Sequence, residues 1–148
     1  MKKSVKVFFT ALLVGFVVSL TSCAAIMSAM MEATVMYDRS YKVDLEVYST
    51  TLTFRSSQNH GGNYDLEVNC SYGGGISKTS YDYQWMLDTS NVDGEKKNIL
   101  IYKDDVVKGT LIPDSLAPTK LTVAENFNLN VNGTTVPFIK YIELDLVN

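Results

Sequence analysis

Apolar and polar residues alternate along most of the chain beyond residue 40. A period of two is typical of a β-strand that turns one face to the core and the other to water, as antiparallel strands do. The clearest runs lie at 41–47, 64–72, 81–87, 126–132 and 142–146. The pattern predicts about eight strands, near residues 41–48, 51–55, 64–72, 80–87, 98–103, 106–112, 119–131 and 134–147. The last two are long enough to break or bend.

Turn-forming residues separate these runs. The segments 59–63 and 73–75 are rich in Gly or Asn, and Asn132-Gly133 is a dipeptide that favours a two-residue hairpin, as is Asp93-Gly94. The prolines of 113–118 cannot lie inside a central strand. Short strands without a long helix favour two packed sheets or a small barrel. We expect an all-β fold, best described as an antiparallel β-sandwich of about seven or eight strands, immunoglobulin-like or similar, although the Cys…Trp…Cys spacing of immunoglobulin domains is absent.

The first 23 residues have a different pattern. Residues 1–6 (MKKSVK) are basic, and residues 7–20 form an uncharged apolar run of fourteen residues. That length is typical of the hydrophobic region of a signal peptide, whereas a membrane-spanning helix needs about 20 residues. The sequence Leu20-Thr21-Ser22-Cys23 follows at once.

This tetrapeptide resembles the lipobox of bacterial lipoproteins, in which an aliphatic residue and two small residues precede a cysteine. The resemblance implies cleavage before Cys23, a lipid thioether on its sulfur and acylation of the new amino group, so that acyl chains hold the protein in the membrane. Ala24 resembles the residue at this place in lipoproteins that two-membrane bacteria send to the outer membrane. Two alternatives stay open. No charged residue occurs from 7 to 31, as in an uncleaved transmembrane anchor, and ordinary secretory cleavage near 22–25 would release the protein.

These features divide the chain into three parts. They are a cleaved signal peptide (1–22), a lipidated N-terminus and tether (23–40), and a single β domain (41–148). Residues 24–36 are rich in Ala and Met, which are good helix formers. We therefore expect a short helix in the tether, and a disordered spacer is the alternative.

Charge and cysteine content narrow the function classes. The net charge is −3, and loss of Lys2, Lys3 and Lys6 with the signal peptide makes it −6. An acidic domain repels polyanions, so we expect no nucleic-acid partner. Of the two cysteines, Cys23 is expected to carry lipid, which leaves Cys70 without a partner for a disulfide within the monomer. Cys70 lies on the apolar parity of its strand, so we interpret it as a core residue.

No catalytic or metal-binding motif emerges. His60, the single histidine, lies in a turn-like Asn-His-Gly-Gly context, where a Ser/His/Asp triad has no recognisable nucleophile elbow. The acidic segment 88–95 does not fit a helical calcium loop, because placing Gly94 at the glycine position puts Thr89 first and Leu100 last. No Cys/His cluster is spaced for zinc. We expect no cofactor.

Two surface motifs remain. Tyr81, Tyr83 and Trp85 form an aromatic row on one strand, which is either core or an exposed platform for a glycan or protein partner. Asp114-Ser115-Leu116 resembles the short O-glycosylation site of exported Bacteroidota proteins.

Two function hypotheses follow. The first, which we favour, is a lipoprotein of the cell envelope that is anchored through Cys23. It would act as a non-enzymatic binding or scaffold module for an envelope protein or glycan. Where the host has two membranes, its localisation would be the outer membrane. The second is an envelope hydrolase with an unrecognised site. The first is favoured because an enzyme needs titratable groups that converge in a pocket, whereas a small β domain presents its end loops as a binding surface. The loops expected to bind a partner are 56–63, 73–79, 88–97 and 113–118.

Overall fold

The structure is a computed structural model, and it describes residues 33–58, 62–73, 75–90 and 96–148. These residues form strands and no extended helix. The strands are β1 (Arg39–Asp44), β2 (Tyr48–Phe54), β3 (Tyr64–Tyr72), β4 (Ile76–Leu87), β5 (Ile99–Lys103), β6 (Val106–Pro113), β7 (Lys120–Val123), β8 (Phe127–Val131), β9 (Thr134–Phe138) and β10 (Glu143–Leu146). The all-β, antiparallel class is confirmed, and the runs at 119–131 and 134–147 each break into two strands.

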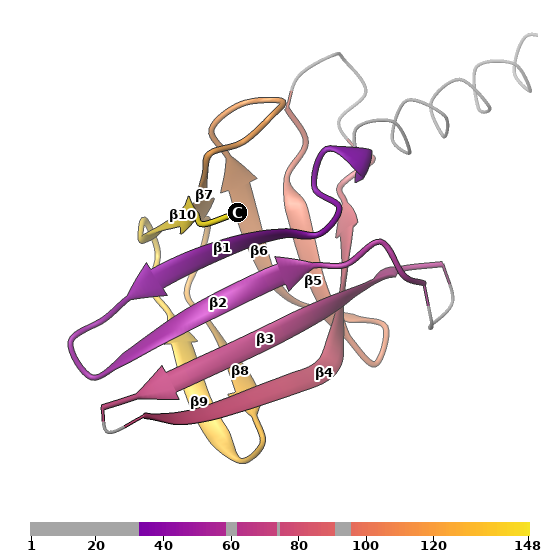
Figure 1. The fold of residues 1–148 in the computed structure, drawn as a ribbon. Helices are drawn as coiled ribbons and strands as arrows, with labels where there is room; N and C mark the ends of the chain where they lie inside the picture. Colours follow the sequence, from indigo (N-terminus) through magenta and orange to yellow (C-terminus); the bar gives the residue numbers. More distant parts are fainter. Residues whose placement is uncertain (1–32, 59–61, 74, 91–95) are drawn as a thin grey trace, which may run out of the picture.

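Eight of the strands close into a barrel in the order β1-β10-β7-β6-β5-β4-β3-β2 (Figure 1). Every neighbouring pair is antiparallel. Closure depends on β10, which pairs with β1 on one side and with β7 on the other. The sequence favoured two packed sheets, and the structure has one continuous wall instead. Alternating strands serve both architectures equally, so the pattern along each strand does not distinguish them.

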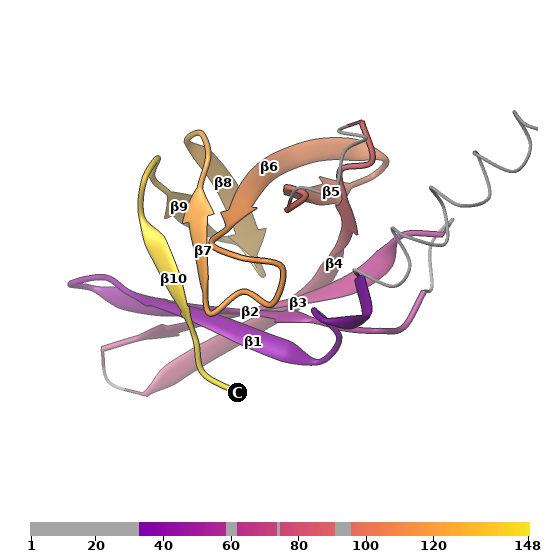
Figure 2. The same cartoon turned by 90° about the horizontal axis from the view of Figure 1, so that it is seen from above.

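The two ends of the barrel differ in what they carry. Because neighbouring strands are antiparallel, the start of β1 lies at the same end of the barrel as the ends of β4 and β6. We call this end, which carries connections 55–63, 88–98 and 114–119, the entry end. The opposite, far end carries connections 45–47, 73–75, 104–105 and 139–142. In Figures 1 and 2, the β1–β2 and β3–β4 connections lie together on the left, and Figure 2 shows the β9–β10 connection apart from them.

The β8–β9 hairpin lies across the far end and contributes to the same core. Its turn, Asn132-Gly133, has two positive φ angles (48° and 85°), as predicted for this dipeptide. The Phe127 ring stacks on Phe138 at 4.7 Å and covers Gly109, where a Cβ would lie 2.6 Å from the ring. Asn132 Nδ2 donates to Thr79 O at 2.7 Å and fixes the hairpin tip to β4. Pro137, which has no N–H, occupies β9 and limits strand addition there.

The folded body begins before β1. Ala33 and Met36 are buried at 3% exposure, and the Tyr37 ring packs on Tyr64 (5.1 Å) and Trp85 (6.2 Å). The predicted start of the β domain at residue 41 lies inside β1, and the described residues that pack against the core begin at Ala33. Of the short helix expected over 24–36, residues 24–32 lie outside the described residues, residues 33–34 are helical, and residues 35–36 form a turn, with Met36 N donating to Ala33 O at 2.9 Å.

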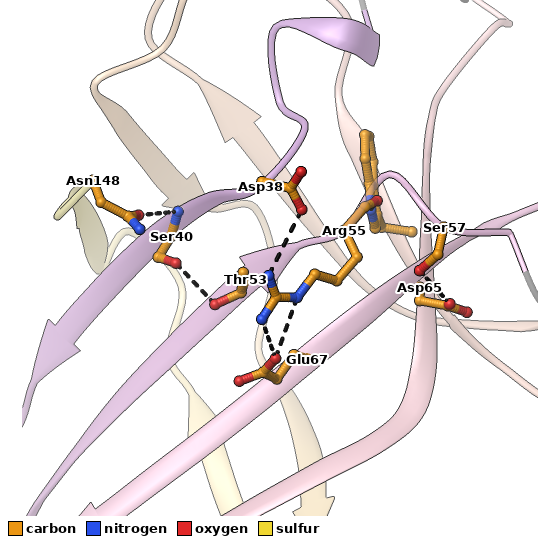
Figure 3. A network of polar contacts seen from close by, with 9 residues as sticks. Asp38, Ser40, Thr53, Arg55, Ser57, Asp65, Glu67 and Asn148 are labelled. Atoms are coloured by element: carbon orange, nitrogen blue, oxygen red, sulfur yellow. Dashed lines mark hydrogen bonds and ion pairs between the residues drawn. The ribbon is translucent and has the colours of Figure 1, made fainter.

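A polar network on the outer wall holds this first segment (Figure 3). The Arg55 Nε and Nη2 atoms donate to Glu67 Oε2 at 3.2 and 2.6 Å, and Nη1 lies 3.7 Å from Asp38 Oδ1. The hydrogen bonds to Glu67 raise the pKa of Arg55. Ser40 Oγ bonds Thr53 Oγ1 at 2.9 Å, and the Ser40 N–H donates to Asn148 Oδ1 at 2.8 Å. Residues 38–40 are thus fixed to the barrel, and residue 148 lies beside them.

Candidate functional site: the far-end rim

The predicted aromatic row does not share one exposed face. Leu66 pairs with Tyr83 and Val68 with Ser80, so Tyr81 and Asp82 both lie opposite Glu67 in a β-bulge. The extra residue reverses the parity of β4. Tyr81 is 66% exposed, whereas Tyr83 (3%) and Trp85 (0%) are buried.

The two buried rings have structural partners. The Tyr83 hydroxyl accepts from Asn130 N at 2.7 Å and so satisfies an outer-edge amide of the β8–β9 hairpin. Trp85 Nε1 donates to Arg55 O at 3.1 Å, and its ring stacks on Tyr64 at 4.9 Å. A three-ring platform for a glycan therefore does not exist on this wall.

Catalytic candidates do not converge in the described part of the chain. His60 and residues 91–95 lie outside the described residues. Ser57 Oγ donates directly to Asp65 Oδ2 at 2.6 Å, with no imidazole between the two side chains as a triad requires. Asp88 bonds Ser90, which lowers the pKa of Asp88. Within the same described residues, no three His, Cys, Asp or Glu side chains gather as metal ligands.

Cys70 is fully buried on β3, as predicted for a core residue. It pairs with Thr50, whose Oγ1 atom is buried and accepts or donates no hydrogen bond within the described structure. The Tyr72 hydroxyl is in the same situation. Burial, together with the nearby Cys70, raises the pKa of Tyr48. This part of the interior is closed, so its thiol has no route to a substrate.

The most distinctive surface is an apolar rim at the far end. Three neighbouring connections each carry large apolar side chains that are more than half exposed. We define the far-end rim as Val47 (72%), Ile76 (59%), Ile139 (51%) and Tyr141 (75%). The β1–β2 and β3–β4 connections lie close together on the left of Figures 1 and 2, and the β9–β10 connection lies at the same end of the barrel on the other side of β1.

Register supports this grouping. Tyr48 pairs with Tyr72, and Tyr72 pairs with Ile76, so two half-buried tyrosines join the β1–β2 and β3–β4 tips. On the other side of β1, the pairing with β10 ends at Lys42 and Asp145, and the 139–142 connection lies at the same end of the barrel. Scattered exposed apolar residues are ordinary, whereas a contiguous group of them marks an interaction surface.

Tyr141 is held in an unfavourable backbone conformation. Its φ is +71°, and every other described non-glycine residue with positive φ is Asp or Asn, which tolerate this region. The Tyr141 N–H donates to Val123 O at 2.9 Å, the Lys140 N–H donates to Asn126 Oδ1 at 2.7 Å, and Lys140 Nζ lies 5.1 Å from the Tyr141 ring. A bulky exposed ring at a position that favours glycine is a pointer to function.

Sequence reasoning missed this loop. The connections expected to bind a partner were 56–63, 73–79, 88–97 and 113–118, and only the second of these lies at the far end. The 139–142 connection was hidden inside a predicted strand at 134–147. The signal for it was local: apolar residues occupy both parities over residues 138–142, so the alternation of apolar and polar positions stops there.

A small recess lies at the entry end. Its floor is apolar (Met36, Leu87, Ile99, Pro113 and Pro118), and Lys96, Lys97, Ser115 and Leu116 surround it. It contains about 20 Å³ of space, which is room for a water molecule and not for an organic substrate. Ser115 of the predicted glycosylation motif is exposed there, and its modification stays a prediction.

The fold defines an all-β domain with an eight-stranded antiparallel barrel and one end covered by a hairpin. No family model matches the chain, and neither the curated proteins nor the solved structures contain a significant match. Among the described residues, no helix has the length and apolarity that crossing a bilayer requires.

Proposed function

We propose that the protein is a lipid-anchored lipoprotein of the bacterial cell envelope, held through Cys23, and that it acts as a binding module without catalysis. The Leu20-Thr21-Ser22-Cys23 lipobox, at the end of an apolar run, is the observation that carries the anchor.

The anchor is tested by Cys23→Ala. Wild-type protein takes up a metabolic palmitate label and enters the detergent phase on phase separation, and the variant loses both properties. A variant that stays in the membrane with residues 1–22 intact would establish the transmembrane alternative instead.

The far-end rim supports a protein partner in preference to a glycan. Glycans stack on aromatic faces, whereas three of the four rim residues are branched aliphatic side chains, which complement apolar protein surface. Charged residues of the same segments, among them Asp44, Glu46 and Lys140, are exposed or half-buried, as in the polar edge of an interface. A partner of this kind would bury the ring of Tyr141 and the aliphatic tips of the two hairpins.

The rim is tested by photo-crosslinking in living cells. A crosslinking side chain at Val47 should give a discrete protein adduct, and one at Val106, which is 54% exposed on the separate β5–β6 hairpin, should not. Equal adducts at both positions, or none, would contradict the proposal. If Val47 gives no protein adduct and the protein is retained on envelope polysaccharide, the far-end rim would be assigned to a glycan instead.

Tyr141→Gly separates binding from folding. Glycine relieves the positive φ and should raise the free energy of unfolding by about 1 kcal/mol. The same substitution should abolish the Val47 adduct. A variant that is more stable and still crosslinks would show that the Tyr141 ring has no part in binding.

A further inference from the structure

The position at which the chain joins the barrel identifies the end that lies nearest the proposed lipid anchor. Residues 24–32 separate Cys23 from Ala33, which is buried in the domain. The ten backbone steps from Cys23 to Ala33 span at most about 35 Å when fully extended. From Ala33 onward the chain is fixed, because Asp38 N donates to Phe54 O at 2.6 Å and Arg39 N donates to Met36 O at 3.2 Å.

The tether therefore reaches the barrel at its entry end. Met36 lies in the entry-end recess beside Leu87 and Pro118, so the last fixed residues of the tether and the 113–118 loop share one face. The far-end rim lies a full strand away, which for the seven residues of β2 is about 24 Å.

The 113–118 loop presents a leucine on a rigid support. Pro118 O accepts from Tyr41 Oη at 2.8 Å and from Arg39 Nη1 at 3.3 Å. The Asp114 carboxylate accepts from Thr119 N at 3.0 Å and from Thr119 Oγ1 at 2.9 Å. Between these fixed points, Leu116 is 61% exposed.

Lysines lie beside this leucine. Lys96 and Lys97 border the recess, and Lys96 Nζ donates to Asp114 O at 3.4 Å. An exposed aliphatic tip with lysines behind it is the arrangement by which a surface contacts phospholipid, since the tip enters the acyl boundary while the ammonium groups remain among phosphates.

The geometry points to the entry-end face, with Leu116 at its tip and Lys96 and Lys97 beside it, as a surface that lies on the lipid bilayer. This inference rests on the proposed lipid anchor at Cys23, and it deepens that proposal by giving the domain a fixed orientation. The far-end rim is then held away from the membrane, toward a partner.

The test uses the full lipidated protein in vesicles of phosphatidylcholine with a minor share of phosphatidylglycerol. An environment-sensitive fluorophore is attached to Leu116→Cys or, as the matched control, to Val47→Cys. Both side chains are highly exposed, so neither change disturbs the core, and the buried Cys70 does not compete for label. Emission of buried Trp85 reports that each variant is folded.

The Leu116 probe should shift to shorter wavelength and lose roughly half of its emission when brominated lipids replace ordinary ones, as a group at the acyl boundary does. The Val47 probe should show neither effect. Equal quenching of both probes, or stronger quenching at Val47, would overturn the orientation.

Flotation of the same vesicles separates this inference from the anchor. Protein that floats while its Leu116 probe stays unquenched contradicts the orientation alone. Wild-type protein that does not float contradicts the anchor itself, and Cys23→Ala provides the unanchored reference.

Discussion

Substitution of Gly109 by alanine tests the packing of the hairpin on the barrel. The new Cβ would lie 2.6 Å from Cγ, Cδ1 and Cδ2 of Phe127, well inside the 3.5–4.0 Å that carbon atoms prefer. The Phe127 ring cannot retreat freely, because its other face stacks on Phe138 at 4.7 Å with an interplanar angle of 5°. Relief therefore requires the whole β8–β9 hairpin to move.

Two opposed effects decide whether Gly109→Ala raises or lowers the free energy of unfolding. Gly109 has no positive φ, so alanine should stabilise the strand through the unfolded state by about 0.4–1 kcal/mol. Overpacking of a closed core costs about 1–3 kcal/mol. The clash is larger, and we expect Gly109→Ala to lower the free energy of unfolding by about 1–2 kcal/mol.

Urea denaturation followed by the fluorescence of Trp85 measures this difference. The control is the same substitution in a Phe127→Ala background, which removes the atoms that the methyl group meets. That background itself costs about 3–5 kcal/mol, and within it Gly109→Ala should become stabilising. A loss of stability of the same size in both backgrounds, or a gain in the wild type, would refute the packing argument.

Three further predictions concern single groups. Thr50→Val should leave the free energy of unfolding unchanged or raise it by about 1 kcal/mol, because the Thr50 hydroxyl is buried without a partner; a clear loss would mean that an internal water bonds it. Burial acts to raise the pKa of Asp114, but hydrogen bonds from Thr119, the backbone of Lys120 and Ser115 lower this pKa below 3.8. The ionised Asp114 side chain therefore stabilises the fold above pH 3.8, and this contribution is lost as the pH falls further. Asp114→Asn should flatten acid unfolding curves below pH 3.8. Burial and the Tyr64 hydroxyl raise the pKa of Tyr37 from 10.0 to about 12, so stability should fall between these pH values, and Tyr37→Phe should remove that loss in alkaline thermal melts.

The strands were predictable because each is a local pattern. The alternation at 64–72 and the turn at Asn132-Gly133 involve residues close in sequence, and both appear as expected. Closure of the barrel is not local. It depends on the pairing of Tyr41 with Leu146 and of Leu121 with Leu144, and an alternating strand pairs equally well in a sandwich.

The aromatic row illustrates a second limit. Parity along β4 holds from Tyr83 to Leu87, and one extra residue opposite Glu67 then turns Tyr81 outward and Ser80 inward. A bulge is set by how two strands match in length and curvature, which composition does not record. The same limit hid Tyr141, because the break between β9 and β10 lies within a mostly apolar run that only Lys140 interrupts.

The topology also explains why binding and anchoring can be divided between the two ends. With eight antiparallel strands in the wall, the chain enters at the start of β1 and β10 leaves at the same end, where Asn148 Oδ1 accepts from Ser40 N. Each far-end connection is therefore a closed loop between two strands, and its length and side chains can change without disturbing the tether. Exposed Val47 and Ile76 are costly at such tips, where polar turn residues would serve folding equally well. Val47 and Ile76 lie on adjacent hairpin tips and the strained Tyr141 lies at the same end of the barrel, so the exposed apolar side chains of this end support the proposed binding surface.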